Sequence, residues 1–157
     1  MVLNSLENLP VMQTPSLCEI WNWQGDTSVL PYKFESVLNA SSTEALYAHG
    51  TLKQEYVKNA RFDPDGFFFL TYRSNAIGLT LAYRCEDDPN TFELPFLVAV
   101  PNHRNKGVEK ALLALILQYC QRQGAQKVIL RSPTINLAAS YDDGVFQACQ
   151  EAGFVQM

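Results

Sequence analysis

Residues 94–124 read LPFLVAVPNHRNKGVEKALLALILQYCQRQG and combine three local patterns. The first part, Leu94–Val100, is an apolar run of strand length. A Pro-Asn-His tripeptide interrupts the run, and after Arg104 apolar residues recur at three- and four-residue steps, as on one face of a helix. Gly124 stands where a left-handed cap would end that helix. The segment therefore predicts a buried strand, a short turn and a long, well-buried helix.

The predicted turn carries residue types that suit an anion. The first turn of a helix offers free backbone N–H groups and the positive end of a dipole. Gly107 lets a ligand approach the main chain, and Arg104, Lys106 and Lys110 add positive charge. These features fit a phosphate or a pyrophosphate. One glycine beside basic residues is a weak signal, so a plain strand–helix connection with solvated charges is an equal alternative.

The segment resembles the acetyl-CoA-binding motif of the GCN5-related N-acetyltransferase (GNAT) superfamily. That motif reads Arg/Gln-x-x-Gly-x-Gly/Ala, after a strand that ends near Val-x-Pro and before a helix that starts with Ala-Leu-Leu. Arg104, Gly107, Val98–Pro101 and Ala111–Leu113 match it. The resemblance implies that acetyl-CoA is the co-substrate. It also implies cofactor contacts from the strand end and the turn: Val98, Ala99, Val100, Arg104, Asn105, Lys106, Gly107, Val108, Glu109 and Lys110.

The sixth motif position departs from the superfamily pattern. Glu109 stands where most members keep Gly or Ala. A carboxylate at this position would face or crowd the pyrophosphate, at a cost on the order of 1 kcal/mol that the neighbouring cations can offset. We therefore expect acetyl-CoA binding to survive in a weakened form, and Glu109→Gly to tighten it.

Composition narrows the class of protein. With 157 residues and 47% hydrophobic content, the chain is expected to form one domain with a sizeable core. Its net charge of -4 gives no support for a nucleic-acid partner. No run approaches the roughly 18 apolar residues of a membrane span, so no membrane partner is expected. The four cysteines form no Cys-x-x-Cys pair, which indicates a reduced, cytoplasmic chain, and no metal-ligand spacing appears.

The rest of the chain predicts helices, a hairpin, and a further strand and helix. Residues 1–14 have little pattern and are expected to be loosely ordered. Residues 61–68 contain an Asp-Pro-Asp-Gly turn and are also similar to mycothiol-synthase-like members of the superfamily. Helices are expected after Pro15 (with Leu17, Ile20 and Trp21 on one face), over 46–59 and over 141–152. Residues 30–38 fit either a strand or a helix, and the helix is preferred. Strands are expected over 67–73 and 76–84, as an antiparallel hairpin, and over 127–131.

This order of elements agrees with the GNAT-like (acyl-CoA N-acyltransferase) fold, which the resemblance covers over about 62–154. We expect an α/β (mixed α+β) architecture with a central mixed, largely antiparallel sheet flanked by helices. One domain is expected over 1–157, with a divergent helical part at 1–60 and the hairpin, CoA-binding motif and C-terminal helix at 61–157. The superfamily often continues beyond the point where this chain stops. The sheet is therefore expected to have a short edge, which a homodimer could cover.

Two residues are candidates for catalysis. In many members a Tyr shortly before a final Gly-Phe donates a proton to the departing CoA thiolate, and in this chain that position is Cys149. A thiol could donate, but a small core residue on an apolar helix face is the favoured alternative; Tyr141 is another possible donor. Members often use a carboxylate as the base, and Glu93, just before the central strand, is the first candidate. An exposed charge at the strand end is its alternative.

Two functions follow from these observations. The first is an acetyl-CoA-dependent N-acyltransferase that moves an acetyl group to a small amine by direct transfer. The acidic pairs Asp87-Asp88 and Asp142-Asp143 would suit a cationic acceptor. The second is a degenerate GNAT-fold binding or interaction module with weak or no catalysis, which Glu109 and Cys149 favour. The otherwise intact strand–turn–helix unit places the enzyme first.

Overall fold

The computed structural model describes residues 1–22, 37, 59–131 and 143–156. In this part of the chain a six-stranded sheet has the order β1-β6-β5-β4-β3-β2. Only β5 and β6 pair in parallel, so the sheet is mixed and largely antiparallel, as predicted. The elements in chain order are β1 (Val2–Leu3), β2 (Cys18–Asn22), η2 (Pro64–Gly66), β3 (Phe67–Tyr72), β4 (Asn75–Arg84), β5 (Thr91–Ala99), η3 (Pro101–His103), α2 (Val108–Arg122), β6 (Lys127–Leu130) and α3 (Asp143–Glu151).

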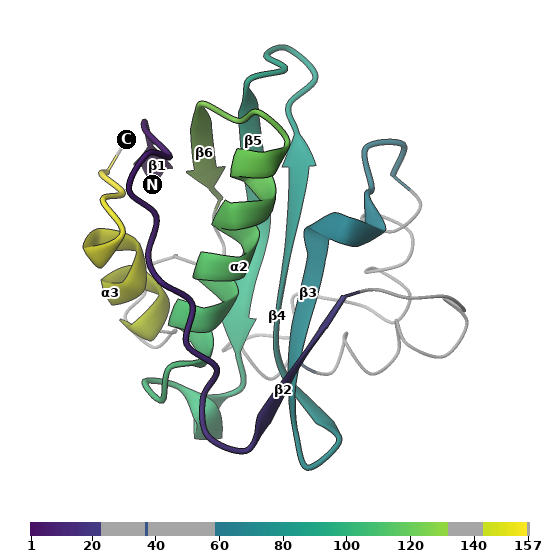
Figure 1. Ribbon diagram of the computed structural model, residues 1–157, viewed down its shortest axis with the longest axis vertical. Helices are drawn as coiled ribbons and strands as arrows, with labels where there is room; N and C mark the ends of the chain where they lie inside the picture. Colours follow the sequence, from purple (N-terminus) through teal and green to yellow (C-terminus); the bar gives the residue numbers. More distant parts are fainter. Residues whose placement is uncertain (23–36, 38–58, 132–142, 157) are drawn as a thin grey trace.

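Helix α2 covers one face of the sheet, with α3 beside it (Figure 1). Their apolar side chains and those on the facing side of the strands form the larger core. The helix lies close to β4 because position 78 is a glycine. A Cβ at Gly78 would lie 2.7 Å from Cγ1 of Val108 and 3.0 Å from Cδ1 of Leu112. This contact fixes the start of α2 against the middle of the sheet.

The opposite face of the sheet carries a second, smaller core. It is rich in aromatic side chains, which contact one another edge to face at centroid separations of 6.3 and 6.4 Å. Its buried members are Val37, Phe67, Phe69, Leu79, Leu81, Tyr83, Phe96 and Val98. Strands β4 and β5 are therefore covered on both faces, as is expected for central strands.

The hairpin and the strand–turn–helix segment confirm the sequence-based predictions. Strands β3 and β4 pair antiparallel through the turn at Arg73-Ser74. The turn before β3 is held by Asp63, whose Oδ1 accepts a hydrogen bond of 3.0 Å from the backbone N of Asp65. Strand β5 begins three residues earlier than expected, at Thr91, and α2 begins at Val108 rather than at Arg104.

The N-terminal predictions were wrong for the described residues. The helix expected after Pro15 is instead the edge strand β2, which pairs with β3 from Cys18↔Tyr72 to Asn22↔Phe68. Its burial alternates with a period of two, which the apolar residues at 17, 20 and 21 obscured. Residues 1–14 are also not loosely ordered throughout, because Met1, Leu3 and Leu6 are buried and β1 pairs with β6.

Other predictions fall outside the described residues. These are most of the helices expected over 30–38 and 46–59, as well as Tyr141 and Asp142. Val37 alone is described in the first of them, as a buried helical residue. At the C-terminal end, Val155 forms an isolated antiparallel bridge with Val2, which adds a contact at the β1 edge. Among the helices that are described, none has the length and apolar character needed to cross a membrane.

Candidate active site

Strand β5 carries a β-bulge beside the point where β6 ends. Leu81 of β4 faces Phe96, but Tyr83 faces Glu93, so Leu94 and Pro95 together oppose a single residue of β4. The parallel pairing with β6 ends at Leu94↔Leu130, whereas β5 continues to Ala99. Bulges re-aim side chains and are common next to active sites. Here the bulge places Glu93 on the same face as Phe96.

The turn after β5 has a backbone shape that suits an anion. Asn105 and Gly107 adopt left-handed conformations, with φ of 59° and 91°. Gly107 is the N-cap of α2 and accepts the first helical hydrogen bond, 3.0 Å from the backbone N of Ala111. Because the N-cap is a glycine, no side chain at that position covers the free amide groups at the start of α2.

The three cations of the turn differ in how they are held. The Nε of Arg104 donates to the carbonyl of Ala99 at 3.2 Å, which ties the turn to the end of β5. The Nζ of Lys106 donates to the carbonyl of Asn102 at 2.8 Å. Lys110 forms an exposed ion pair of 2.9 Å with Glu151 of α3. All three lie at the start of α2, so the positive charge expected from the sequence is present there.

Glu109 is buried at the start of α2 and binds the turn itself. The residue is only 2% exposed. Its Oε1 accepts a hydrogen bond of 3.0 Å from the backbone N of Asn105. The carboxylate therefore lies against an amide of the turn, and the expectation that it weakens pyrophosphate binding stays a prediction.

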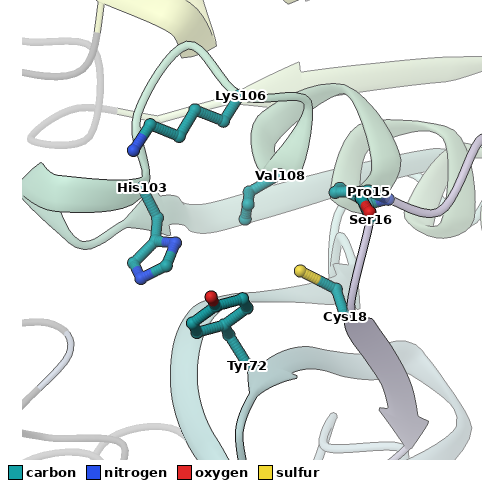
Figure 2. Close-up of a pocket in the computed structure, with 7 residues that line it drawn as sticks. All are labelled: Pro15, Ser16, Cys18, Tyr72, His103, Lys106 and Val108. Atoms are coloured by element: carbon teal, nitrogen blue, oxygen red, sulfur yellow. The ribbon is translucent and has the colours of Figure 1, made fainter.

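A pocket of about 270 Å³ opens beside the turn (Figure 2). His103 contacts Tyr72 in it, with ring centroids 5.1 Å apart. Tyr72 ends β3 and Cys18 begins β2, so the pocket lies toward the β2–β3 side of the turn and away from β6. Its lining residues are Pro15, Ser16, Cys18, Tyr72, His103, Lys106 and Val108.

Glu93, the predicted base, lies between two guanidinium groups. Its Oε1 is 3.0 Å from Nη1 of Arg61 and its Oε2 is 3.0 Å from Nε of Arg131. Arg61 also lies 5.0 Å over the ring of Tyr83. The carboxylate is thus an ion-paired group at the bulge rather than an isolated charge. The two arginines lie far from Glu93 in the sequence, and no local motif predicts these contacts.

Cys149, the predicted proton donor, is fully buried in the core shared by α2, α3 and the sheet. Burial raises the pKa of its thiol to about 12. A thiol with this pKa would give its proton to an ordinary thiolate, of pKa about 8.5, against a free-energy gradient. Its role as donor stays a prediction, and its surroundings favour the core alternative.

Asp88, one of the acidic residues proposed to suit a cationic acceptor, has local structural partners. Asp88 accepts hydrogen bonds from the hydroxyl of Thr91 at 2.6 Å and from the backbone N of Asn90 at 3.0 Å. These bonds, the Thr91 hydroxyl first, lower the pKa of its carboxyl. Asp88 therefore shapes the turn before β5.

Comparison with protein families identifies the chain. Residues 34–141 match the family model described as the Acetyltransferase (GNAT) family. The chain belongs to this family. A search of curated proteins returns no match.

Solved structures with the same fold include several acetyltransferases. A GCN5-related N-acetyltransferase from Sphaerobacter thermophilus has a TM-score of 0.73 at 12% identity; the match covers 97% of this chain and 46% of that one, so this chain spans under half of its length. The ribosomal-protein-S18-alanine N-acetyltransferase from Escherichia coli has a TM-score of 0.65 at 16% identity, with 89% and 79% covered. AAC(6')-Iy in complex with the bisubstrate analog CoA-S-monomethyl-acetylneamine has a TM-score of 0.63 at 17% identity, with 90% and 92% covered. At these identities the likeness concerns the fold.

Proposed function

We propose that the chain transfers an acetyl group from acetyl-CoA to a small amine. The observation that carries the proposal is the turn at the end of β5, where left-handed residues at 105 and 107 open the N-terminus of α2. Free N–H groups and the helix dipole bind a pyrophosphate well. Arg104, Lys106 and Lys110 supply positive charge beside them, and residues 98–100 lead into the turn. One neighbour of the same fold binds a CoA analog, which supports the same reading.

The reaction is a direct acyl transfer. The amine nitrogen attacks the thioester carbon, the C–N bond forms, the C–S bond breaks, and the thiolate of CoA leaves. A base takes one proton from the amine, and an acid returns one to the thiolate. Glu93 lies at the bulge of β5, where it can accept that proton directly or through water. Its two arginine partners hold the carboxylate in one orientation.

The acid that protonates the thiolate has no accessible candidate at the superfamily position. Cys149 occupies the superfamily position, but its thiol is buried and its pKa is raised to about 12. Solvent can protonate a departing thiolate without a protein donor. The second candidate function is a GNAT-fold binding module without turnover, and the burial of Cys149 is the observation that favours it.

Several finer expectations belong to the proposal as well. We place the protein in the cytoplasm, with a homodimer through the short edge of the sheet as one arrangement. The likeness of residues 61–68 to mycothiol-synthase-like members stays a sequence-based prediction.

Two glycines that flank α2 allow a matched test of the cofactor site. Gly107 and Gly124 have φ of 91° and 85°, and at neither position would a Cβ meet an atom closer than 3.6 Å. Both Ala variants carry a similar backbone strain, but only Gly107 lies at the turn. Calorimetric titration with acetyl-CoA should show binding for the wild type and for Gly124→Ala, and weakened binding for Gly107→Ala. Absence of wild-type binding at millimolar acetyl-CoA would refute the enzyme proposal.

A further inference from the structure

We propose that Glu109 is a positioning residue, which holds the turn at residues 104–107 in the shape that receives the pyrophosphate. The inference rests on the proposed function. The sequence suggests that a carboxylate at this motif position repels the anion and weakens its binding. The structure instead leads us to expect that Glu109 strengthens the binding of pyrophosphate. The contacts of Glu109 with Asn105 on one side and Gly144 on the other carry the argument.

The first contact fixes an unfavourable backbone conformation. Asn105 is not a glycine, yet its φ is 59°. Such conformations are costly and persist when surrounding contacts determine them. The hydrogen bond of 3.0 Å from the backbone N of Asn105 to Oε1 of Glu109 is such a contact. With its side chain only 2% exposed, Glu109 is held by packing as well, so this bond has little freedom to break.

The second contact joins the turn to α3. A Cβ at Gly144 would lie 2.6 Å from Oε1 and 2.8 Å from Cδ of Glu109, and 2.9 Å from Oδ1 of Asn105. A Cβ at position 144 would displace the carboxylate from this position. Glu109 and Gly144 therefore form a matched pair, in which a large residue in the first turn of α2 is accommodated by the absence of a side chain in the first turn of α3.

The charge of Glu109 is compatible with a neighbouring anion because of this orientation. The carboxylate lies beside the first turns of two helices, whose positive dipole ends stabilise it. The N–H group of Asn105 is used by the carboxylate. An incoming pyrophosphate is therefore left with the N–H groups of the first turn of α2 and with the cations around them. Glu109 thus selects which amides remain for the ligand.

The test separates positioning from general stability by using a co-substrate that lacks the pyrophosphate. CoA and acetyl-CoA contain this group, whereas S-acetyl-pantetheine does not. For Glu109→Ala we expect the dissociation constant for CoA to rise tenfold or more, and the kcat/KM for S-acetyl-pantetheine to fall by a much smaller factor. Glu109→Gln keeps an oxygen acceptor of the same reach, so it should restore CoA affinity to within about threefold of the wild type.

Hydrogen exchange at the backbone amide of Asn105 reports on its bond to Glu109 without any ligand. The amide proton of Asn105 should exchange slowly with solvent in the wild type and in Glu109→Gln, and faster in Glu109→Ala. The matched control is Glu151→Ala, which removes the exposed ion pair with Lys110 between the same two helices. This variant should weaken neither the binding of CoA nor the protection of the Asn105 amide. Gly144→Ala should reproduce the loss of CoA affinity by displacing the carboxylate, and should add little in the double variant with Glu109→Ala.

The outcomes distinguish this inference from the proposed function. If the wild type binds no CoA while the Asn105 amide is protected by Glu109, the proposed function fails, and with it the assignment of the turn to pyrophosphate. If CoA binds and Glu109→Ala leaves its affinity unchanged or tightens it, the positioning role is overturned. Equal losses for CoA and S-acetyl-pantetheine would also overturn it, because they would indicate general destabilisation.

Discussion

The hydroxyl of Tyr119 donates a hydrogen bond of 2.6 Å to Oδ2 of Asp63. This bond joins the face of α2 to the turn that leads into β3. The other oxygen of Asp63 caps the same turn through the backbone N of Asp65. Gly66 lies directly against the phenol ring, where a Cβ would be 2.8 Å from Cε1. Helix α2 is thus anchored near its C-terminal end by a polar contact, in addition to its apolar packing.

Removal of this hydroxyl is expected to destabilise the fold. Tyr119→Phe removes the hydrogen bond to Oδ2 of Asp63, and hydrogen bonds to charged groups contribute about 1.5–3 kcal/mol. Urea unfolding should show a loss of that size with an unchanged m-value. Tyr72→Phe, which changes a tyrosine at the pocket, should have a smaller effect. An equal loss in both variants would contradict the assignment.

Alkaline pH is expected to destabilise the protein through two buried thiols. Burial raises the pKa of both Cys120 and Cys149 to about 12. The folded-state pKa therefore exceeds the unfolded value of about 8.5, and the stabilisation is fully present below that value and is lost as pH rises toward 12. Above about pH 8.5 the free energy of unfolding should fall by up to about 1.4 kcal/mol per pH unit for each thiol. Measured at several pH values, Cys149→Ala should show a shallower fall than the wild type.

The central fold could be predicted because its signals are local. The apolar run, the basic turn and the helical periodicity of 94–124 are complete within one segment, and the structure places β5, the turn and α2 there. The edge strands were not predicted, since their stability comes from partners distant in sequence. Val2 and Leu3 pair with Ile129 and Val128, and nothing within a two-residue strand announces such a contact.

The site could be predicted only where its signals are local in the sequence. Glycine and cations around 104–107 are visible in the sequence, but the direction of a side chain is not. Glu109 reads as an exposed charge until Gly144 is brought against it by the packing of α3 on α2. Likewise, Arg61 and Arg131 reach Glu93 only because β5 and β6 are neighbours and the bulge sets the face of the carboxylate.

Substitution of Glu93 tests its role as base. If Glu93 accepts the amine proton, Glu93→Gln should lower kcat by about a hundredfold or more, with acetyl-CoA affinity little changed. Arg131→Gln removes one of the two partners and leaves Arg61 in place, so a smaller loss is expected. Steady-state kinetics with the best amine of a panel, together with calorimetric titration of acetyl-CoA, measure both quantities. A rate for Glu93→Gln within a few-fold of the wild type would move the base elsewhere.

Cys149→Ala distinguishes a donor from a core residue. Because Cys149 is buried in the core, we expect the rate per folded molecule to stay close to that of the wild type. The lost packing should lower the free energy of unfolding by on the order of 1 kcal/mol. Activity at saturating substrates and the urea midpoint report on the two effects separately. A hundredfold loss of rate in a folded variant would establish the thiol as the proton donor instead.

Gly78 tests how closely α2 must approach the sheet. Gly78→Ala should destabilise the protein by about 1–3 kcal/mol, because the new methyl overlaps Val108. Val108→Ala removes that overlap, so the double variant should lose less than the sum of the two single variants. Urea unfolding of the four proteins gives the coupling energy. Additive losses would show that the backbone moves to accept the methyl.

The bridge between Val2 and Val155 has a consequence for the order of folding. It joins residues from the two ends of the sequence, so its formation closes a loop that contains almost the whole chain, and the entropic cost of closure grows with loop length. The hairpin β3–β4 closes a loop of a few residues and can form early. Strand β1 can dock only after β6 and the C-terminal residues have reached each other. Substitutions at Val2 should therefore accelerate unfolding and leave the refolding rate almost unchanged.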